Sequence, residues 1–200
     1  VIDYGVGNLF SLCSSLKYIG ADVTVTSDAE QIRKADRIIL PGVGAFADAI
    51  DKLRSKGLDK VIKEEAAAGK DMMGICLGMQ LLFEKSFEYG EHEGLGLLKG
   101  SVVPMEGNLP EGLKIPHIGW NQLEFTKDHR LLSKINEGDC VYFVHSYYAQ
   151  DCDDSLIAAT DYGRKITAAV ARDNVMGCQF HPEKSGKTGL AILRAFCEGE

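Results

Sequence analysis

The stretch "DMMGICLGMQLLF", residues 71–83, decides the fold. It opens with a short apolar run that is typical of a buried strand, and the residues after Cys76 are predicted to form a helix that runs to Ser86. Cys76 stands between Gly74 and Gly78, where the two segments meet. A cysteine in a packed core needs no such setting, whereas a cysteine presented at the tip of a sharp turn does. The stretch therefore predicts a strand, a tight turn and a helix, with Cys76 at the turn.

Strand-like and helix-like segments alternate along the first half of the chain. They are VIDY (1–4), a helical stretch over 9–19, DVTVT (22–26), RIILPG (37–42) and a helical stretch over 46–68. Such alternation predicts parallel strands with helices packed on both faces of the sheet. Right-handed crossovers then leave the C-terminal ends of the strands on one edge, where open α/β sheets place their sites. The glycine-rich loops 41–44 and 74–78 fall on that edge.

The second half of the chain is richer in closely spaced strand-like segments. They are GLGLLKGSVVPM (94–105), KIPHIGWNQLEF (114–125), DCVYFVHSYYA (139–149), SLIAATDY (155–162), KITAAVARD (165–173) and NVMGCQFHP (174–182). Turn-rich pieces between them predict a more antiparallel region joined to the same sheet, followed by a last helix over 185–198. We therefore expect an α/β fold with an open mixed, mainly parallel sheet flanked by helices and a more antiparallel C-terminal half. We expect one domain that spans residues 1–200.

Composition and charge exclude several classes of function. The net charge of −7 and the absence of a basic stripe argue against a nucleic-acid partner. No apolar run approaches the length of a membrane span, and the first residues do not resemble a signal peptide. The six cysteines form no C-x-x-C pair, which favours free thiols in a reducing, cytoplasmic setting. Cys178 and His181 form a lone C-x-x-H without a second ligand pair, so we expect neither a metal nor a cofactor.

The G-x-C-x-G pattern around Cys76 has the layout of a nucleophile elbow. Side chains at Gly74 and Gly78 would clash in so tight a turn, and the cysteine would be held in a strained backbone conformation. A helix that starts at Leu77 would favour a thiolate, and the Leu77 N–H would donate to an oxyanion. In the alternative interpretation, Cys76 is a small buried residue and the glycines only allow close packing.

The segment GCQFHPEKS, residues 177–185, supplies a candidate base for the cysteine. Pro182 keeps His181 extended, and residues two apart in an extended stretch point the same way, so Glu183 would orient the imidazole of His181. In the alternative interpretation, this is a surface turn with an incidental histidine. The two motifs together favour chemistry because each supplies what the other lacks. His117 and His145 have no carboxylate two residues away, so we interpret them as structural or pocket-lining residues.

Five motifs in this order resemble the class I glutamine amidotransferases, and most closely the glutaminase subunits of imidazole glycerol phosphate synthase. The motifs are PGVGAF (41–46), GICLGMQLLFE (74–84), PHIGWN (116–121), YFVHSYYA (142–149) and GCQFHPEKS (177–185). Their spread means that the resemblance covers essentially the whole chain. Met79 stands where anthranilate and GMP synthase amidotransferases usually have a histidine, which favours the histidine-pathway branch of the family.

The resemblance implies a role for each motif. It implies a triad of Cys76, His181 and Glu183 that hydrolyses glutamine to glutamate through a thioester and releases ammonia. It implies an oxyanion hole formed by backbone groups of Val43, Gly44 and Leu77. The residues that it implies for binding glutamine are Gly42, Gly44, Gln80, Glu84, Ser146 and Tyr147.

The resemblance also implies a partner, a (β/α)8-barrel cyclase subunit that forms a heterodimer with this chain and uses the ammonia in histidine biosynthesis. The residues that it implies for the partner interface are Asn8, Pro116, Trp120, Asn121 and Lys184. Trp120 has a core aromatic as its alternative interpretation, and Lys184 has a solvated charge. Three other functions stay open at this point. They are a glutaminase subunit of a different synthase, a non-catalytic interaction protein of the same fold, and a cysteine hydrolase acting on another amide.

Overall fold

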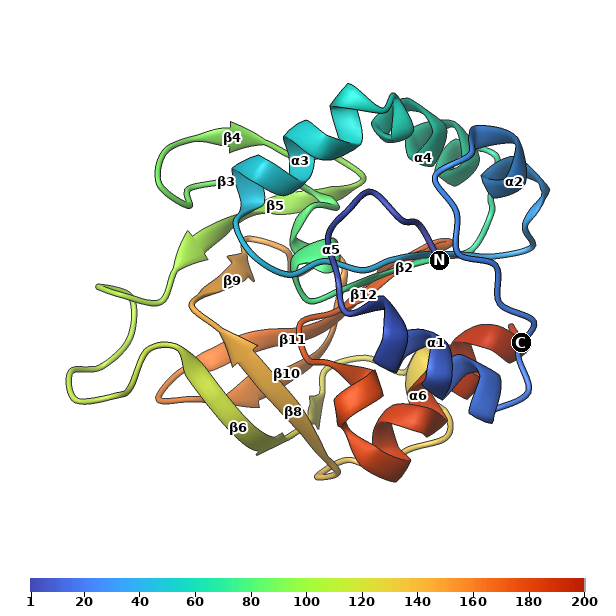
Figure 1. Cartoon of the computed structure of the whole chain (residues 1–200). Coiled ribbons are helices and arrows are strands. Elements are labelled where there is room, and N and C mark those ends of the chain that lie inside the picture. The colour runs from blue at the N-terminus through green and yellow to red at the C-terminus, as the bar shows by residue number, and fades with distance from the viewer. Residues whose placement is uncertain (200) are drawn as a thin grey trace.

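The computed structural model describes residues 1–199 and has a six-stranded mixed sheet at its centre (Figure 1). Three neighbouring strands are parallel: β1 (Ile38–Leu40), β2 (Met72–Ile75) and β12 (Val175–Cys178). Three further strands continue the sheet in antiparallel fashion: β11 (Lys165–Arg172), β10 (Leu156–Asp161) and β7 (Glu124–Phe125). The parallel part, which carries the turn after β2, therefore combines two strands from the first half of the chain with one from near its C-terminal end.

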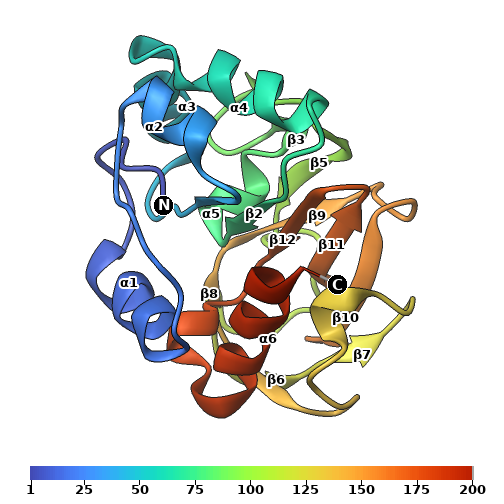
Figure 2. The same cartoon turned by 90° about the vertical axis from the view of Figure 1, so that its right-hand side faces the viewer.

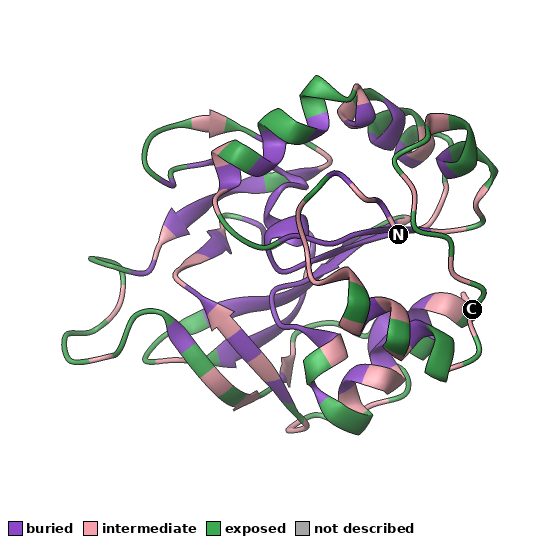
Figure 3. Ribbon diagram, viewed as in Figure 1, coloured by how far each residue is buried: buried purple, intermediate pink, exposed green. Residues whose placement is uncertain are grey.

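Helices cover both faces of the parallel strands (Figure 2). On one side lie α2 (Ala29–Lys34), α3 (Phe46–Ser55) and α4 (Leu58–Ala67), and on the other lie α1 (Leu9–Tyr18) and α6 (Gly186–Glu198). Successive residues of a strand point to opposite faces, so Ile38 and Leu40 pack in one apolar cluster and Ile39 in the other. Figure 3 shows the result, with the central strands buried and the outer sides of the helices exposed.

Two smaller sheets flank the central one. One has the order β4 (His92–Glu93), β3 (Phe83–Ser86), β5 (Leu98–Pro104) and β9 (Tyr147–Gln150). The other pairs β6 (His117–Gln122) with β8 (Cys140–His145) in antiparallel register. Because only Ser146 separates β8 from β9, the chain passes directly from one small sheet to the other at this residue.

The mixed sheet and its antiparallel C-terminal half confirm the expected fold class, but the structure differs from the expectation in three places. The strands expected at 1–4 and 22–26 are reduced to one bridge between Ile2 and Thr26, so the parallel part is smaller than expected. The helix expected over 46–68 is two helices, because Gly57 takes a left-handed conformation with φ +66°.

The third difference follows Cys76, where the expected ten-residue helix is α5 (Leu77–Gln80) and β3 begins at Phe83. Leu81, Leu82 and Phe83 are all fully buried. An apolar run that is buried on every side does not distinguish a helix from a strand by its periodicity, and this is why the sequence pattern was misleading here.

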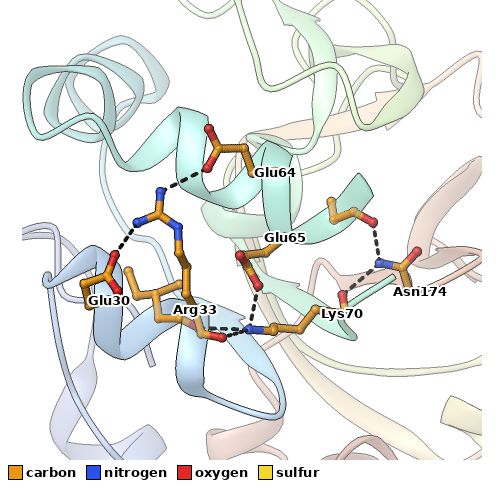
Figure 4. Close-up of polar contacts among 8 residues, drawn as sticks. Glu30, Arg33, Glu64, Glu65, Lys70 and Asn174 are labelled. Atoms are coloured by element: carbon orange, nitrogen blue, oxygen red, sulfur yellow. Dashed lines mark hydrogen bonds and ion pairs between the residues drawn. The ribbon is translucent and has the colours of Figure 1, made fainter. Parts of the chain in front are cut away.

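Lys70 connects helices α2 and α4 to each other and to the segment before β12 (Figure 4). Its ammonium lies 2.6 Å from the carboxylate of Glu65 in α4 and donates to the carbonyls of Ile32 and Arg33 at the end of α2, at 3.2 and 2.6 Å. A cation at this position also complements the partial negative charge of a helix C-terminus. Asn174, just before β12, donates to the Lys70 carbonyl at 2.8 Å. The Lys70 side chain thus joins α2 to α4, and the backbone carbonyl of Lys70 joins this residue to Asn174 before β12.

We expect Lys70→Met to lower the free energy of unfolding by about 2 kcal/mol, because it leaves a largely buried carboxylate and two carbonyls without their donor. Denaturant-induced unfolding measures this loss. Lys85→Met is the matched control, since the Lys85–Glu91 pair is exposed and long at 3.7 Å, and such pairs contribute little. Equal effects of the two substitutions would contradict the role assigned to Lys70.

Candidate active site

Cys76 occupies a strained turn between β2 and α5. Its backbone has φ +53° and ψ −113°, a combination that non-glycine residues rarely adopt. The turn is held by the Cys76 N–H, which donates to the Cys178 carbonyl of β12 at 2.8 Å. The strand, turn and short helix therefore place Cys76 as the G-x-C-x-G pattern predicts. Its side chain is mostly buried, but it reaches the wall of a cavity.

The glycines around Cys76 are required by contacts between backbone atoms. A Cβ on Gly74 would lie 2.6 Å from the Gly78 carbonyl oxygen, and one on Gly78 would lie 1.9 Å from the Leu40 carbonyl oxygen. A Cβ on Gly42 would lie 2.7 Å from the Gly78 nitrogen. The loop after β1 thus packs on the turn with no side chain between them. The resemblance implies that Gly42 binds glutamine. In the structure Gly42 lies in this backbone contact and does not line the cavity.

His181 follows β12 and lies beside Glu183. Its Nδ1 is 2.8 Å from the Glu183 Oε1, and both side chains are only 3% exposed. His181 is extended, as Pro182 predicts, but Glu183 belongs to a 3₁₀ turn (Pro182–Lys184), so the two side chains meet because the chain turns. Ser185 fixes this segment by donating to the His181 carbonyl at 2.6 Å and accepting from the Tyr142 N–H at 2.9 Å.

The charges around His181 favour its protonated form. Burial lowers the pKa of the imidazole, but hydrogen bonds and charge from Cys76 and Glu183 outweigh burial and raise the pKa to about 9. Since Nδ1 faces Glu183, Nε2 is the nitrogen left for Cys76. The structure therefore joins Glu183 to His181 by a hydrogen bond and places His181 and Cys76 on the wall of one cavity, in the order that an orienting carboxylate, a base and a nucleophile need. The Cys76 sulfur also accepts from the Gln179 amide at 3.7 Å.

Cys76 and His181 border an open cavity of about 520 Å³, and Glu183 lies behind His181, outside the cavity wall. Of the residues expected at the site, those that line it are Val43, Gly44, Cys76, Leu77, Gln80, Ser146, Tyr147, His181 and Lys184. Residues that the sequence did not single out for this site also line it, among them Glu88, Tyr89, Glu106 and Ile115. A second cavity of about 530 Å³ lies beside the start of β1, near Arg37, and contains neither Cys76 nor His181.

Gln80 and Glu88 are two buried polar residues in the wall of the same cavity. Gln80 donates to the Tyr147 carbonyl at 3.1 Å and to Gln179 at 2.9 Å. Glu88 accepts from the Phe46 N–H, the first of α3, at 2.7 Å, and burial raises the pKa of this carboxyl. No sequence signal places Glu88 near Cys76, because the irregular path through β3 brings it back to the cavity.

Glu84 is a correction to the expected site. The helix expected to run to Ser86 would put Glu84 one turn beyond Gln80 on the same face, but the helix ends at Gln80 and Glu84 lies in β3. Its carboxylate accepts from the Gly100 N–H at 3.0 Å, and it does not line the cavity. Glu84 therefore supports the join between β3 and β5.

The residues expected at a partner interface have different surroundings. Trp120 is 55% exposed and packs edge-on against Tyr142, which is not the position of a core aromatic. Lys184 lies 5.9 Å from the Tyr142 ring and also lines the cavity. Asn8 caps α1 through a 3.5 Å contact with the Ser11 N–H. The remaining two do not line the cavity: Pro116 lies just before β6, next to the cavity residue Ile115, and the Asn121 side chain of β6 contacts His117.

Two negative findings apply to residues 1–199. Within this range no three histidine, cysteine, aspartate or glutamate side chains are grouped so that they could hold a metal ion. None of the helices described is both long and apolar enough to cross a membrane.

We expect His181 to titrate near pH 9 and Cys76→Ala to lower that midpoint, because Cys76 is the first of the groups that raise it. A raised pKa means that the charged imidazole stabilises the fold below pH 6.5 and that this contribution disappears as the pH rises through about 9. NMR titration of the imidazole protons measures the midpoint. Cys140→Ala, which removes an exposed cysteine, should leave it unchanged. An unaltered midpoint in Cys76→Ala would show that the thiol does not contact the imidazole.

Comparison with known proteins agrees with this geometry. The family model of class I glutamine amidotransferases matches residues 1–198. The imidazole glycerol phosphate synthase subunit HisH of Caldanaerobacter subterraneus subsp. tengcongensis is 55% identical over 199 residues, which are 99% of this chain and 96% of the relative. The HisH subunit of Aquifex aeolicus is 51% identical over 198 residues, 98% of this chain and 94% of the relative.

Solved structures share the fold at much lower identity. A crystal structure described as a glutamine amidotransferase has a TM-score of 0.77 at 18% identity and covers 98% of this chain and 96% of its own. The structure of PurLQS from Thermotoga maritima has a TM-score of 0.76 at 21% identity, and the match covers 98% of this chain and 95% of the PurLQS chain. These two structures confirm the fold alone, and the sequence relatives identify the branch. The chain therefore belongs to the class I glutamine amidotransferases and, within that family, to the HisH subunits of imidazole glycerol phosphate synthase.

Proposed function

We propose that Cys76, His181 and Glu183 hydrolyse glutamine to glutamate and ammonia, and that the ammonia passes to a cyclase subunit that makes imidazole glycerol phosphate in histidine biosynthesis. The observation that carries this proposal is that His181, hydrogen-bonded to Glu183, and Cys76 line the same cavity, and that Cys76 and Glu183 together raise the pKa of the imidazole. It supplies a nucleophile and a group that can exchange protons with it. The family relationship supplies the substrate class.

The reaction divides into two steps. In the first, the Cys76 sulfur attacks the amide carbon of glutamine, the carbon–nitrogen bond breaks, and the imidazolium of His181 protonates the leaving nitrogen to give ammonia. In the second, His181 takes a proton from water as the water attacks the thioester, and glutamate leaves while Cys76 is restored. Glu183 holds the imidazole in one orientation and stabilises its charged form.

Backbone groups near Cys76 stabilise the oxyanion that forms on the amide carbon. Leu77 carries the first N–H of α5, which has no acceptor within its own helix. The loop that bears Val43 and Gly44 lies against the same turn and lines the same cavity. Donors that are fixed before the reaction are worth more than donors that must reorganise.

The part of the cavity wall that carries Glu88 and Gln80 suits the amino-acid end of glutamine. Glu88 presents a largely buried carboxylate, which is the natural partner of an α-ammonium group. Backbone groups of Ser146 and Tyr147 supply further polar contacts, and Gln80 braces the Tyr147 carbonyl. Substrate would then span the cavity, with its amide directed at Cys76.

The surface beside the cavity suits a protein partner. Ile118 and Trp120 belong to β6 and have 58% and 55% of their surface exposed. Trp120 contacts Tyr142, whose ring lies 5.9 Å from Lys184 at the cavity border. A half-exposed aromatic residue such as Trp120 is a common anchor in protein interfaces. We assign the partner as a (β/α)8-barrel cyclase subunit that forms a heterodimer over this face. Ammonia in neutral water is mostly protonated and unreactive, so a covered route between the sites would preserve it. The six unpaired cysteines support a cytoplasmic setting.

We expect Cys76→Ala to reduce glutamine-dependent synthesis by about 10³-fold or more, because no other group can form the thioester. Synthesis from added ammonium salt should persist, because the cyclase receives ammonia directly. The measurement is product formation by the complex of this chain with the cyclase subunit, supplied with either nitrogen source. Cys140→Ala is the control and should retain both activities. Glutamine-dependent synthesis that survives in Cys76→Ala would refute the assignment.

A further inference from the structure

Two buried histidines that the proposed reaction does not use face each other between β6 and β8. The Nδ1 of His117 lies 3.1 Å from the Nε2 of His145, and both residues are buried. His117 is also stacked between Phe143 and Tyr162, at 4.9 and 4.0 Å between ring centres. The pair is therefore held rigidly, and each ring has one further nitrogen to satisfy.

Each of these outer nitrogens meets an oxygen. The Nδ1 of His145 lies 2.8 Å from the Tyr147 carbonyl, and the Nε2 of His117 lies 2.8 Å from the Asn121 Oδ1. The Asn121 amide is oriented by its other end, which donates to the Asp161 carbonyl at 3.2 Å. Both ends of the chain of contacts are therefore acceptors.

A count of protons shows that the chain of contacts is one hydrogen short. Three contacts, two at the ends and one between the rings, require three N–H groups, whereas two neutral imidazoles carry only two. Burial lowers the pKa of both rings, that of His145 to about 3, and His181 adds an unfavourable charge nearby. Tyr162 and the Asp161 carbonyl are the other polar groups that approach the pair, and neither supplies a proton to the rings. The pair therefore stays neutral, and its two ends compete for the same hydrogens.

The two ends belong to different functional surfaces. The Tyr147 carbonyl lines the cavity and also accepts from Gln80, so its position sets part of the substrate wall. Asn121 is partly exposed and is the neighbour of Trp120 in β6. Satisfying both ends at once would leave two lone pairs facing each other across the 3.1 Å contact between the rings. With a hydrogen kept in that contact, satisfying one end leaves the other without a donor.

We propose that His117 and His145 are positioning residues whose limited supply of protons links the Tyr147 carbonyl in the cavity to the Asn121 amide on β6. When Asn121 accepts a hydrogen bond from His117, the protons lie on Nε2 of both rings, and Gln80 is the only one of these groups that still donates to the Tyr147 carbonyl. When the Tyr147 carbonyl accepts a hydrogen bond from His145, the protons lie on Nδ1 of both rings. In the exchange, solvent water beside the partly exposed Asn121 takes the proton from His117 Nε2, the proton of His145 Nε2 passes to His117 Nδ1, and solvent water from the cavity that His145 lines supplies a proton at His145 Nδ1, so the total is unchanged. That the Tyr147 wall binds glutamine rests on the proposed function, whereas the proton exchange does not.

The test uses the full chain labelled with ¹⁵N in histidine and glutamine side chains, with no substrate present. Asn121→Ala removes the competing acceptor, so the His145 Nδ1 resonance should move toward the protonated position and the Gln80 side-chain amide should move with it. His117→Phe, which keeps an aromatic ring in the stack, should move both resonances in the same directions. Gln122→Ala is the matched control, because Gln122 lies on the exposed face of β6, and it should move neither.

Three results would overturn the proposal. The first is a His145 Nδ1 resonance that is the same in the wild-type chain and in Asn121→Ala. The second is a pair that carries three protons at neutral pH, since the ends then no longer compete. The third is a shift of His145 without any shift of the Gln80 amide, which would separate the pair from the cavity wall. Because none of these readouts requires glutaminase activity, they remain interpretable if the proposed reaction is wrong.

Discussion

The backbone contact between Gly42 and Gly78 is the constraint on which the site depends. Neither residue has room for a Cβ, since one would lie 2.7 Å from a nitrogen and the other 1.9 Å from a carbonyl oxygen. The contact presses the loop after β1 onto the turn after β2, so Val43, Gly44 and Cys76 face the same cavity. It also keeps Cys76 at φ +53°, a conformation that an isolated peptide would leave. The parallel strands, covered on both faces, supply the rigidity that holds this strain.

Electrostatics then separates one histidine from the others. His181 is buried, but it faces Glu183 and Cys76, and so it holds a proton well above neutral pH. His117 and His145 are buried without a carboxylate partner, and the pKa of each is lowered. Two kinds of imidazole thus lie close together, one suited to proton transfer at Cys76 and the other to neutral hydrogen bonds between β6 and the cavity wall. The difference arises from their partners, because all three are buried.

Local patterns predicted those parts of the site that local geometry determines. The glycines around Cys76 and the proline after His181 act through their own backbones, so their consequences were readable from the sequence. The end of α5 at Gln80 and the place of Glu88 in the cavity depend on how Leu81, Leu82 and Phe83 are enclosed by distant segments. Such packing leaves no periodic signal, and the expectation for Glu84 failed for this reason. Whether Trp120 lies in the core or on the surface was likewise settled only by the pairing of β6 with β8.

The most direct test of the account is covalent labelling of the chain by a glutamine analogue that carries an electrophilic carbon in place of the amide. Mass spectrometry of the digested protein identifies the modified residue. The account predicts one adduct per chain, on Cys76, with a rate that falls when glutamine is added and when His181 is replaced by alanine. Labelling of exposed Cys140 at the same rate as Cys76, or labelling of Cys76 that glutamine does not slow, would contradict it.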